Sequence, residues 1–187
     1  MKLIPAVLFS AMIVMFGSVA VAVDVGQQTP SFEAKDQDGN SWNLSDHLGE
    51  KHVVLYFYPA AMTGGCTKQA CAYRDHYKAG EATFDVVGIS GDPVQNLKWF
   101  QQAEGLNFIL LSDPDGTIAK AFGVPVKERD DSITRTVNGE EVVLTRSATA
   151  ARWTFIIDPE GKVVYRNNQV KPVADLGNVL GFLQGAK

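Results

Sequence analysis

The stretch VVLYFYPAAMTGGCTKQAC, residues 53–71, decides the fold of this 187-residue chain. It opens with an uninterrupted apolar run, residues 53–58, which is typical of a central strand covered on both faces. Pro59 ends this strand, and the turn that follows leads into a helix expected over residues 63–79. A buried strand, a tight turn and a helix in this order predict an α/β fold.

The two cysteines of the sequence, Cys66 and Cys71, both lie in the expected helix. Thr63 is the predicted N-cap, with its hydroxyl accepting a hydrogen bond from a backbone N–H two or three residues on. Cys66 then lies in the first turn, where unpaired N–H groups and the helix dipole favour negative charge. The thiolate is the nucleophilic form of cysteine. Cys66 is therefore the candidate nucleophile.

Cys71 follows Cys66 by five residues. In an intact α-helix the α-carbons of two such residues lie about 8.6 Å apart, whereas a disulfide requires about 4.4–6.8 Å. A bond between the two cysteines therefore requires this part of the helix to unwind, which suits a disulfide that forms and breaks in a catalytic cycle. The alternatives are two small buried hydrophobic residues or a permanent strained bond.

The pattern around Cys66 resembles the active-site signature Pro-x-x-x-Thr-x-x-Cys of the peroxiredoxins, the AhpC/TSA-like proteins. The signature falls on Pro59, Thr63 and Cys66. A second cysteine five residues on is similar to the bacterioferritin-comigratory, or PrxQ, subgroup. Further matching motifs occupy residues 87–90, 110–116, 119–124 and 152–158, so the resemblance extends from about residue 25 to the C-terminus. It implies a thioredoxin-like fold.

The resemblance implies a catalytic role for five residues. Cys66 would be the peroxidatic cysteine, which a hydroperoxide oxidises to sulfenic acid, and Cys71 the resolving cysteine that forms an intramolecular disulfide with it. Thr63 would hold the thiolate and the peroxide, Arg152 would polarise the O–O bond, and Pro59 would shield the site from water. This chemistry needs no metal, haem or flavin.

One position departs from the family pattern. The family often has Thr-Pro-Gly-Cys, whereas this chain has a glycine, Gly64, in place of the proline. Losing the proline predicts a looser turn and a less rigid site.

The implied activity is a thiol-dependent peroxidase that reduces hydrogen peroxide and organic hydroperoxides, with a thioredoxin-like protein as reductant. One alternative is an exported thiol-disulfide oxidoreductase, although these typically use Cys-x-x-Cys. Another is a copper-carrying assembly factor, which would use Cys-x-x-x-Cys and a distant downstream histidine. The histidines here are His47, His52 and His76, and none follows residue 76.

The N-terminus predicts export. Lys2 is followed by a largely apolar stretch, residues 3–23, and Ala20-Val21-Ala22 fits a small-x-small cleavage site. We therefore expect residues 1–22 to be a signal peptide and residues 23–187 to form a periplasmic protein. The alternative is a retained membrane anchor. Disulfides persist in the periplasm, so the cysteine pair would need a dedicated reducing partner.

Composition indicates one domain without nucleic-acid binding. The chain has 17 basic and 21 acidic residues, a formal net charge of −4, and no basic run appears. The length after cleavage, about 165 residues, suits a single core. We expect a monomer that has no membrane contact once the signal peptide is removed.

The remaining elements predict a mixed central sheet with helices on both faces. Strands or hairpins are expected at residues 31–44, 84–90, 108–111, 153–157 and 162–166. Helices are expected at residues 117–122 and 175–183. A further helix should begin at Asp92-Pro93, with Asp92 as N-cap, and end near Gly105.

Residues 125–151 are longer than the resemblance leads us to expect. Asn138-Gly139, between residues 133–137 and 142–144, predicts a tight hairpin within this insertion. The insertion is either a solvated excursion without a role, or a flap or reductant-docking surface beside Arg152.

Overall fold

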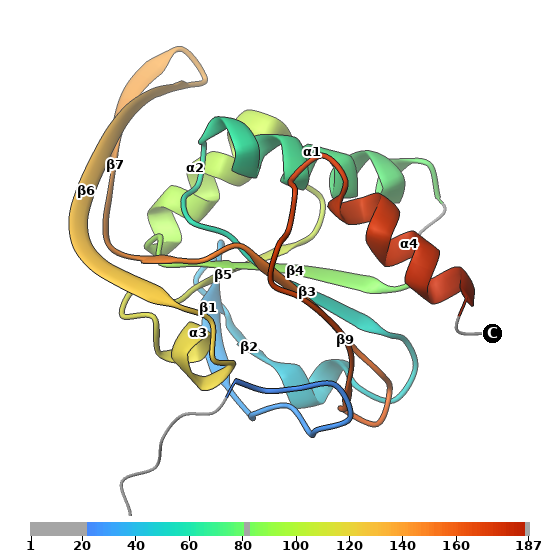
Figure 1. The fold of residues 1–187 in the computed structure, drawn as a ribbon. Coiled ribbons are helices and arrows are strands. Elements are labelled where there is room, and N and C mark those ends of the chain that lie inside the picture. The colour runs from blue at the N-terminus through green and yellow to red at the C-terminus, as the bar shows by residue number, and fades with distance from the viewer. Residues whose placement is uncertain (1–21, 81–82, 186–187) are drawn as a thin grey trace, which may run out of the picture.

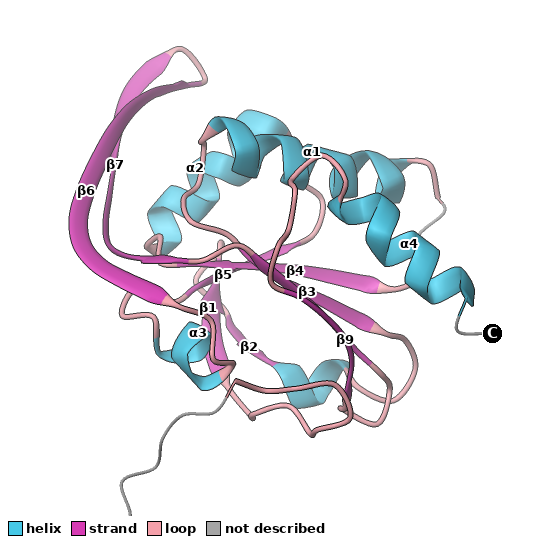
Figure 2. Cartoon of the chain, viewed as in Figure 1, coloured by secondary structure: helices cyan, strands magenta, loops and turns pink. Residues whose placement is uncertain are grey.

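A computed structural model of the chain describes residues 22–80 and 83–185. The predicted signal peptide therefore lies outside the described residues, apart from its last residue, Ala22. The elements are β1 (Glu33–Asp36), β2 (Ser41–Asn43), the 3-10 helix η1 (Leu44–His47), β3 (Val53–Phe57), α1 (Gly64–Lys78), β4 (Asp85–Ser90), α2 (Val94–Glu104), β5 (Ile109–Ser112), α3 (Thr117–Ala121), β6 (Val126–Val137), β7 (Glu140–Ala150), β8 (Trp153–Ile157), β9 (Val163–Asn167) and α4 (Asp175–Gly185). Figure 2 shows the helices and strands in separate colours.

The predicted α/β architecture with a mixed sheet is confirmed. Seven strands form one sheet in the order β2-β1-β5-β4-β3-β8-β9. β3 pairs parallel with β4 and antiparallel with β8, and all five of its residues are fully buried. The run at residues 53–58 is apolar throughout because this strand has protein on both faces.

Helices cover both faces of the sheet (Figure 1). On one face, side chains of α1, α2 and α4 join Tyr56 in one buried cluster. On the other face, α3 and Phe57 belong to a second cluster. Neighbouring residues of β3 contribute to different clusters because side chains alternate across a strand. No helix in the described part of the chain has the length and apolarity to span a bilayer.

The start of α2 corrects one prediction. Asp92 does not cap this helix: the N-cap is Pro93, and α2 begins at Val94. The Asp92 carboxylate instead accepts hydrogen bonds from the backbone N–H of Ala61 and from the Arg146 side chain, which come from other parts of the chain. The predicted end of the helix is confirmed, because Gly105 is its C-cap with φ 58°.

The predicted hairpin in the insertion is confirmed and is longer than expected. β6 and β7 form a separate two-stranded sheet that covers most of residues 125–151. Asn138 and Gly139 both have positive φ, 52° and 88°, as a tight hairpin turn requires. In Figure 1 the hairpin curves along the α2 side of the molecule, and its turn extends past the helices.

Candidate active site

The turn between β3 and α1 presents Cys66 on the face of the sheet that α1, α2 and α4 cover. Pro59, half-buried, follows the strand directly, and Thr63 is the N-cap of α1 as predicted. The predicted capping bond is wrong: the Thr63 hydroxyl donates to the carbonyl oxygen of Ala60 at 2.9 Å and makes no cap bond. The N–H groups of the first turn, including that of Cys66, are therefore left without a capping side chain.

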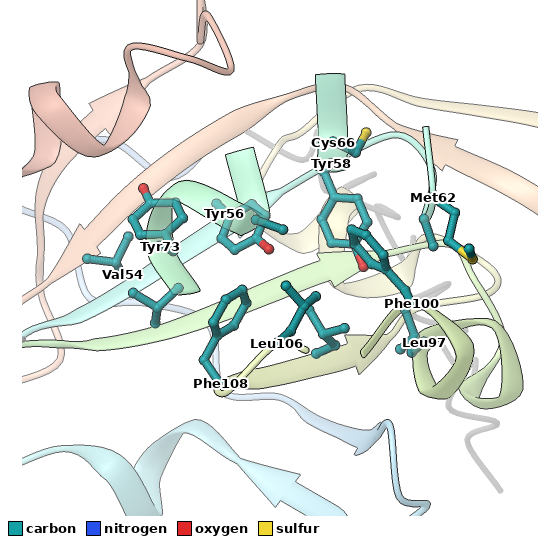
Figure 3. Close-up of a cluster of buried hydrophobic side chains, with 14 of the residues drawn as sticks. Val54, Tyr56, Tyr58, Met62, Cys66, Tyr73, Leu97, Phe100, Leu106 and Phe108 are labelled. Atoms are coloured by element: carbon teal, nitrogen blue, oxygen red, sulfur yellow. The ribbon is translucent and has the colours of Figure 1, made fainter. Parts of the chain in front are cut away.

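Cys66 is buried, with 2% of its surface exposed. It belongs to the cluster in Figure 3, together with Tyr58 and Met62. Burial raises the pKa of Tyr58 well above its ordinary value, so this phenol stays protonated. The sulfur thus lies in an apolar and aromatic setting, where a nearby charge acts more strongly than in water.

Arg152 supplies that charge. Its side chain reaches Cys66 from the segment between β7 and β8, with Nη2 3.1 Å from Sγ. A guanidinium remains protonated in proteins and has only donors. Its position lets it stabilise negative charge on the sulfur, and it lies where the resemblance puts the arginine of the family. Its catalytic role remains a prediction.

Arg152 is held by a chain of hydrogen bonds through four side chains that the sequence analysis missed. Its Nη1 donates to the side-chain oxygen of Gln69, and Nε2 of Gln69 donates to Asp175 Oδ2 at 2.6 Å. Tyr73 and Thr154 donate to the same carboxylate oxygen at 2.8 and 2.9 Å. We call these five side chains the arginine network.

The arginine network is centred on a buried carboxylate. Asp175 is fully buried, and its Oδ1 has no hydrogen-bond partner among the described residues. Burial raises the pKa of Asp175, while the hydrogen bonds from Gln69, Tyr73 and Thr154 and the charge of Arg152 act to lower it. The spacing could have revealed Gln69, because it follows Cys66 by three residues and residues three apart lie on the same face of a helix. Asp175 is remote in sequence and gave no such signal.

Cys71 lies further along α1 and is half-buried. Its Sγ donates to Oε2 of Glu104 at 3.5 Å. Burial raises its pKa, and the carboxylate of Glu104 adds to the rise, while Arg74 opposes it. Both cysteines are free thiols in an unbroken helix. This geometry separates the two sulfurs, as predicted, and corresponds to the reduced state.

Two prolines lie close to the first turn of α1, Pro59 in sequence and Pro172 in space. Pro59 closes the strand before the turn, and Pro172 lies in the loop before α4. A Cβ built on Gly65 would lie 3.4 Å from Cγ of Pro172 and 3.5 Å from Nη2 of Arg152. Gly65 therefore lies beside both Pro172 and the guanidinium, and an added methyl group would make ordinary van der Waals contacts with them. The sequence analysis did not identify Pro172.

Two of the histidines stack on aromatic side chains. His47 stacks on Trp42 with 4.6 Å between ring centroids, and His76 stacks on Phe84 at 5.5 Å. Within residues 22–80 and 83–185, no three His, Cys, Asp or Glu side chains come together as a metal site.

Comparison with known proteins now identifies the family. The AhpC/TSA family matches residues 25–166. The chain belongs to this family. Chloroplastic peroxiredoxin Q from Triticum aestivum is 41% identical over 170 residues, which cover 90% of this chain and 70% of the relative. A putative peroxiredoxin of Mycobacterium tuberculosis is 41% identical over 149 residues, covering 78% and 85%.

Solved structures agree with this assignment. Peroxidoxin BcpB from Mycobacterium tuberculosis has a TM-score of 0.71 and 36% identity, covering 88% of this chain and 99% of its own. A cysteine-to-serine mutant of PrxQ from Xylella fastidiosa has a TM-score of 0.72 and 26% identity, covering 89% and 98%. This peroxiredoxin therefore has the thioredoxin-like fold of its family, and it is a peroxidase of the oxidoreductase class.

Proposed function

We propose that this peroxiredoxin reduces hydrogen peroxide and organic hydroperoxides through Cys66, and that Cys71 resolves the oxidised form as an intramolecular disulfide. The observation that carries the proposal is the 3.1 Å contact between Arg152 Nη2 and Cys66 Sγ at the first turn of α1. A permanent cation and unpaired backbone N–H groups beside one buried sulfur support Cys66 as the nucleophile.

The first step is a displacement at oxygen. The Cys66 thiolate attacks the terminal oxygen of the hydroperoxide, an S–O bond forms and the O–O bond breaks. The departing oxygen takes a proton and leaves as water or alcohol, and Cys66 becomes a sulfenic acid. Arg152, together with the N–H groups of the first turn, stabilises the charge that moves from sulfur to oxygen.

In the second step the sulfenic acid is converted to a disulfide, which the reductant then returns to two thiols. Unwinding of α1 brings the Cys71 sulfur to the sulfenic acid, the S–S bond forms and water leaves. A dithiol reductant of the thioredoxin type then reduces the disulfide and is itself oxidised. The intact helix in the reduced state supports a cycle in which unwinding precedes disulfide formation.

The proposed substrate range is based on similarity to a protein of known structure. The bacterioferritin comigratory protein of Xanthomonas campestris, a structure described by its alkyl peroxide reduction activity, has a TM-score of 0.69 and 26% identity. This likeness is the support for including organic hydroperoxides in the proposed substrate range.

The location and assembly of the protein also belong to this proposal. We propose export to the periplasm with cleavage after Ala22, because the N-terminal pattern fits a signal peptide. The mature protein would be a monomer. N-terminal sequencing of the protein recovered from a periplasmic extract tests the cleavage, and a chain that still begins at Met1 would contradict it.

Intact-mass spectrometry tests the chemistry. After one equivalent of hydrogen peroxide, reduced wild-type protein should lose two hydrogens, and Cys71→Ser should gain one oxygen. Cys66→Ser should keep its reduced mass, and with excess peroxide Cys71→Ser should advance to sulfinic acid. Normal turnover of Cys71→Ser with the same reductant would exclude the resolving role. Wild-type thiols that stay reduced for minutes would exclude the peroxidase cycle.

A further inference from the structure

The β6–β7 hairpin lies against the active-site turn, residues 59–63, instead of projecting into solvent along its whole length. Its side chains alternate in burial, and Leu144, Arg146 and Ala148 of β7 are buried. Val137 of β6 and Leu144 belong to the same buried cluster as Met62 and Cys66. One face of the hairpin is therefore part of the core that supports the thiol.

Two polar contacts connect the hairpin to the backbone of the turn. Nε of Arg135 donates to the carbonyl oxygen of Met62 at 2.9 Å. The backbone N–H of Ala61 donates to Oδ2 of Asp92 at 2.7 Å, and Nε of Arg146 donates to Oδ1 of Asp92 at 2.9 Å. The Asp92 and Arg146 side chains are 0% and 1% exposed. We call Arg135, Asp92 and Arg146 the turn clamp.

The turn that these groups hold is strained. Met62 has φ 56°, in the left-handed region that residues with a Cβ rarely adopt. Such a conformation persists only where the surroundings determine it. The carbonyl that Arg135 binds belongs to Met62 itself, and Thr63 and Gly64 follow it into the helix. The clamp therefore acts where the missing proline would otherwise have made the turn rigid.

Close packing and further hydrogen bonds hold Asp92, a member of the turn clamp, in place. A Cβ built on Gly91 would lie 2.1 Å from the carbonyl oxygen of Ala148, so the backbone of β7 lies directly on the segment that contains Asp92. Nδ2 of Asn96 donates to Asp92 Oδ1 at 3.0 Å and to the carbonyl oxygen of Thr145 at 2.9 Å. A movement of the hairpin would therefore move the group that holds Ala61.

We propose that Arg135, with the Asp92–Arg146 pair, positions the active-site turn in its peroxide-reactive conformation and opposes the unwinding that disulfide formation requires. The proposal rests on the proposed function, because it assigns opposite effects to the two steps of that cycle. Holding the turn keeps the first-turn N–H groups and Cys66 in place for attack on peroxide. Releasing it makes the beginning of α1 easier to unwind, which lets Cys71 approach.

Arg135→Ala separates these effects. Loss of one half-buried hydrogen bond of ordinary net strength should slow formation of the Cys66 sulfenic acid about three- to tenfold and speed disulfide formation by a similar factor. The matched control is Arg129→Ala, which removes the same charge from an exposed position on the same strand. Arg135 is half-buried at the molecular surface, and thermal unfolding checks that the variant remains folded.

Rapid mixing with peroxide, followed by intact-mass analysis, measures both steps. The gain of one oxygen follows the first step, whose rate depends on peroxide concentration. The loss of two hydrogens follows the second step, whose rate becomes independent of peroxide when peroxide is in excess. Opposite changes in the two rates, with Arg129→Ala like wild type, are the expected result.

Three outcomes would overturn the proposal. Two unchanged rates with a lower melting temperature would make Arg135 a stabilising residue only, and equal slowing of both steps would remove the bias between the two conformations. A matching effect of Arg129→Ala would reduce the result to surface charge. Wild-type protein that gains no oxygen and forms no disulfide would instead contradict the proposed function, on which this inference depends.

Discussion

The two polar networks of the active site differ in what they touch. The arginine network reaches the sulfur, because Arg152 Nη2 lies 3.1 Å from Sγ. The turn clamp reaches only backbone atoms, the Met62 carbonyl and the Ala61 N–H. Charge beside a reacting atom changes the energy of its transition state, whereas a contact to backbone changes which conformation is populated. Substitutions in the arginine network should therefore slow oxidation alone, whereas substitutions in the turn clamp should slow oxidation and speed disulfide formation.

The largest effect should come from Arg152→Met, which keeps the length of the side chain and removes its charge. Loss of a donor aimed at developing charge typically slows an enzyme by about 10²–10³-fold. We expect the rate constant for oxidation of Cys66 to fall by this factor, as measured by the peroxide dependence of sulfenic acid formation. The control is Lys162→Met, which removes an exposed cation near β9. Equal rates for Arg152→Met and the control would remove Arg152 from the chemistry.

Gly91→Ala should disturb the turn clamp through the backbone. The added Cβ would lie 2.1 Å from the Ala148 carbonyl oxygen, so β7 or the loop before α2 must shift. Overpacking of this kind typically lowers the free energy of unfolding by about 1–3 kcal/mol. Urea unfolding measures the loss of stability. The ratio of the oxidation rate to the rate of disulfide formation should fall, as we expect for Arg135→Ala.

Gly177→Ala in α4 is the matched control for that variant, because no atom lies within 4 Å of the built Cβ. Replacing a helical glycine by alanine should raise the free energy of unfolding by about 0.5–1 kcal/mol. If both alanine variants were equally stable, the close packing between β7 and Gly91 would make no contribution to the free energy of unfolding.

The sequence predicted the part of the site that is local. Residues 53–71 contain strand, turn, N-cap position and both cysteines in one continuous stretch, so periodicity and turn chemistry were sufficient. Arg152 could be assigned only through the resemblance, since an arginine at the start of a strand is usually solvated. Asp92 was misread as a helix cap because its sequence context fits one, whereas its partners are distant in sequence.

The turn clamp could not be predicted because its partners depend on the register of β6 and β7. Arg135 and Arg146 occupy strands that also carry exposed charges, such as Arg129. Only the tertiary structure shows that Arg146 faces inward beside the buried Leu144 and Ala148. The hairpin turn itself was predictable, since Asn138-Gly139 favours the positive φ values that it adopts.

Asp175→Asn tests the arginine network away from the sulfur. An amide keeps the shape of the carboxylate but accepts hydrogen bonds less strongly, so Gln69 should hold Arg152 less firmly. We expect oxidation of Cys66 to slow about three- to tenfold, in the range of a weakened charged hydrogen bond. Its rate of disulfide formation should stay close to that of wild type, in contrast to Gly91→Ala. Equal slowing of both steps would contradict the division between the networks.

Asp175→Asn also tests how the stability of the protein depends on pH. The pKa of Asp175 is raised by burial, so the folded protein keeps this proton to a higher pH than the unfolded chain. Its contribution to stability is fully present below the unfolded pKa of about 3.9 and is lost as pH rises through the raised folded pKa. The stability of wild type relative to Asp175→Asn should therefore decrease from acidic toward neutral pH. Urea unfolding of both proteins across this range measures it, and a constant difference would contradict the raised pKa.

The smallest effect should come from Glu104→Gln, which touches neither network. Glu104 accepts a hydrogen bond from Cys71 and adds to the rise of its pKa, whereas its backbone carbonyl, which Arg74 binds, is unchanged by the substitution. Removing the carboxylate should lower the pKa of Cys71, as measured by the ultraviolet absorbance of its thiolate in a Cys66→Ser background. Glu50→Gln, on an exposed loop, is the control.

In the catalytic cycle, Glu104→Gln should affect only the steps that follow oxidation of Cys66. A larger thiolate fraction at Cys71 makes it a better nucleophile, although unwinding of α1 carries Cys71 away from Glu104 before the disulfide forms. The gain in the rate of disulfide formation should therefore be smaller than the change in the pKa alone would give. If the rate instead rose in full proportion to the thiolate fraction, Cys71 would react from its place in the intact helix, and the turn clamp would have no unwinding to oppose.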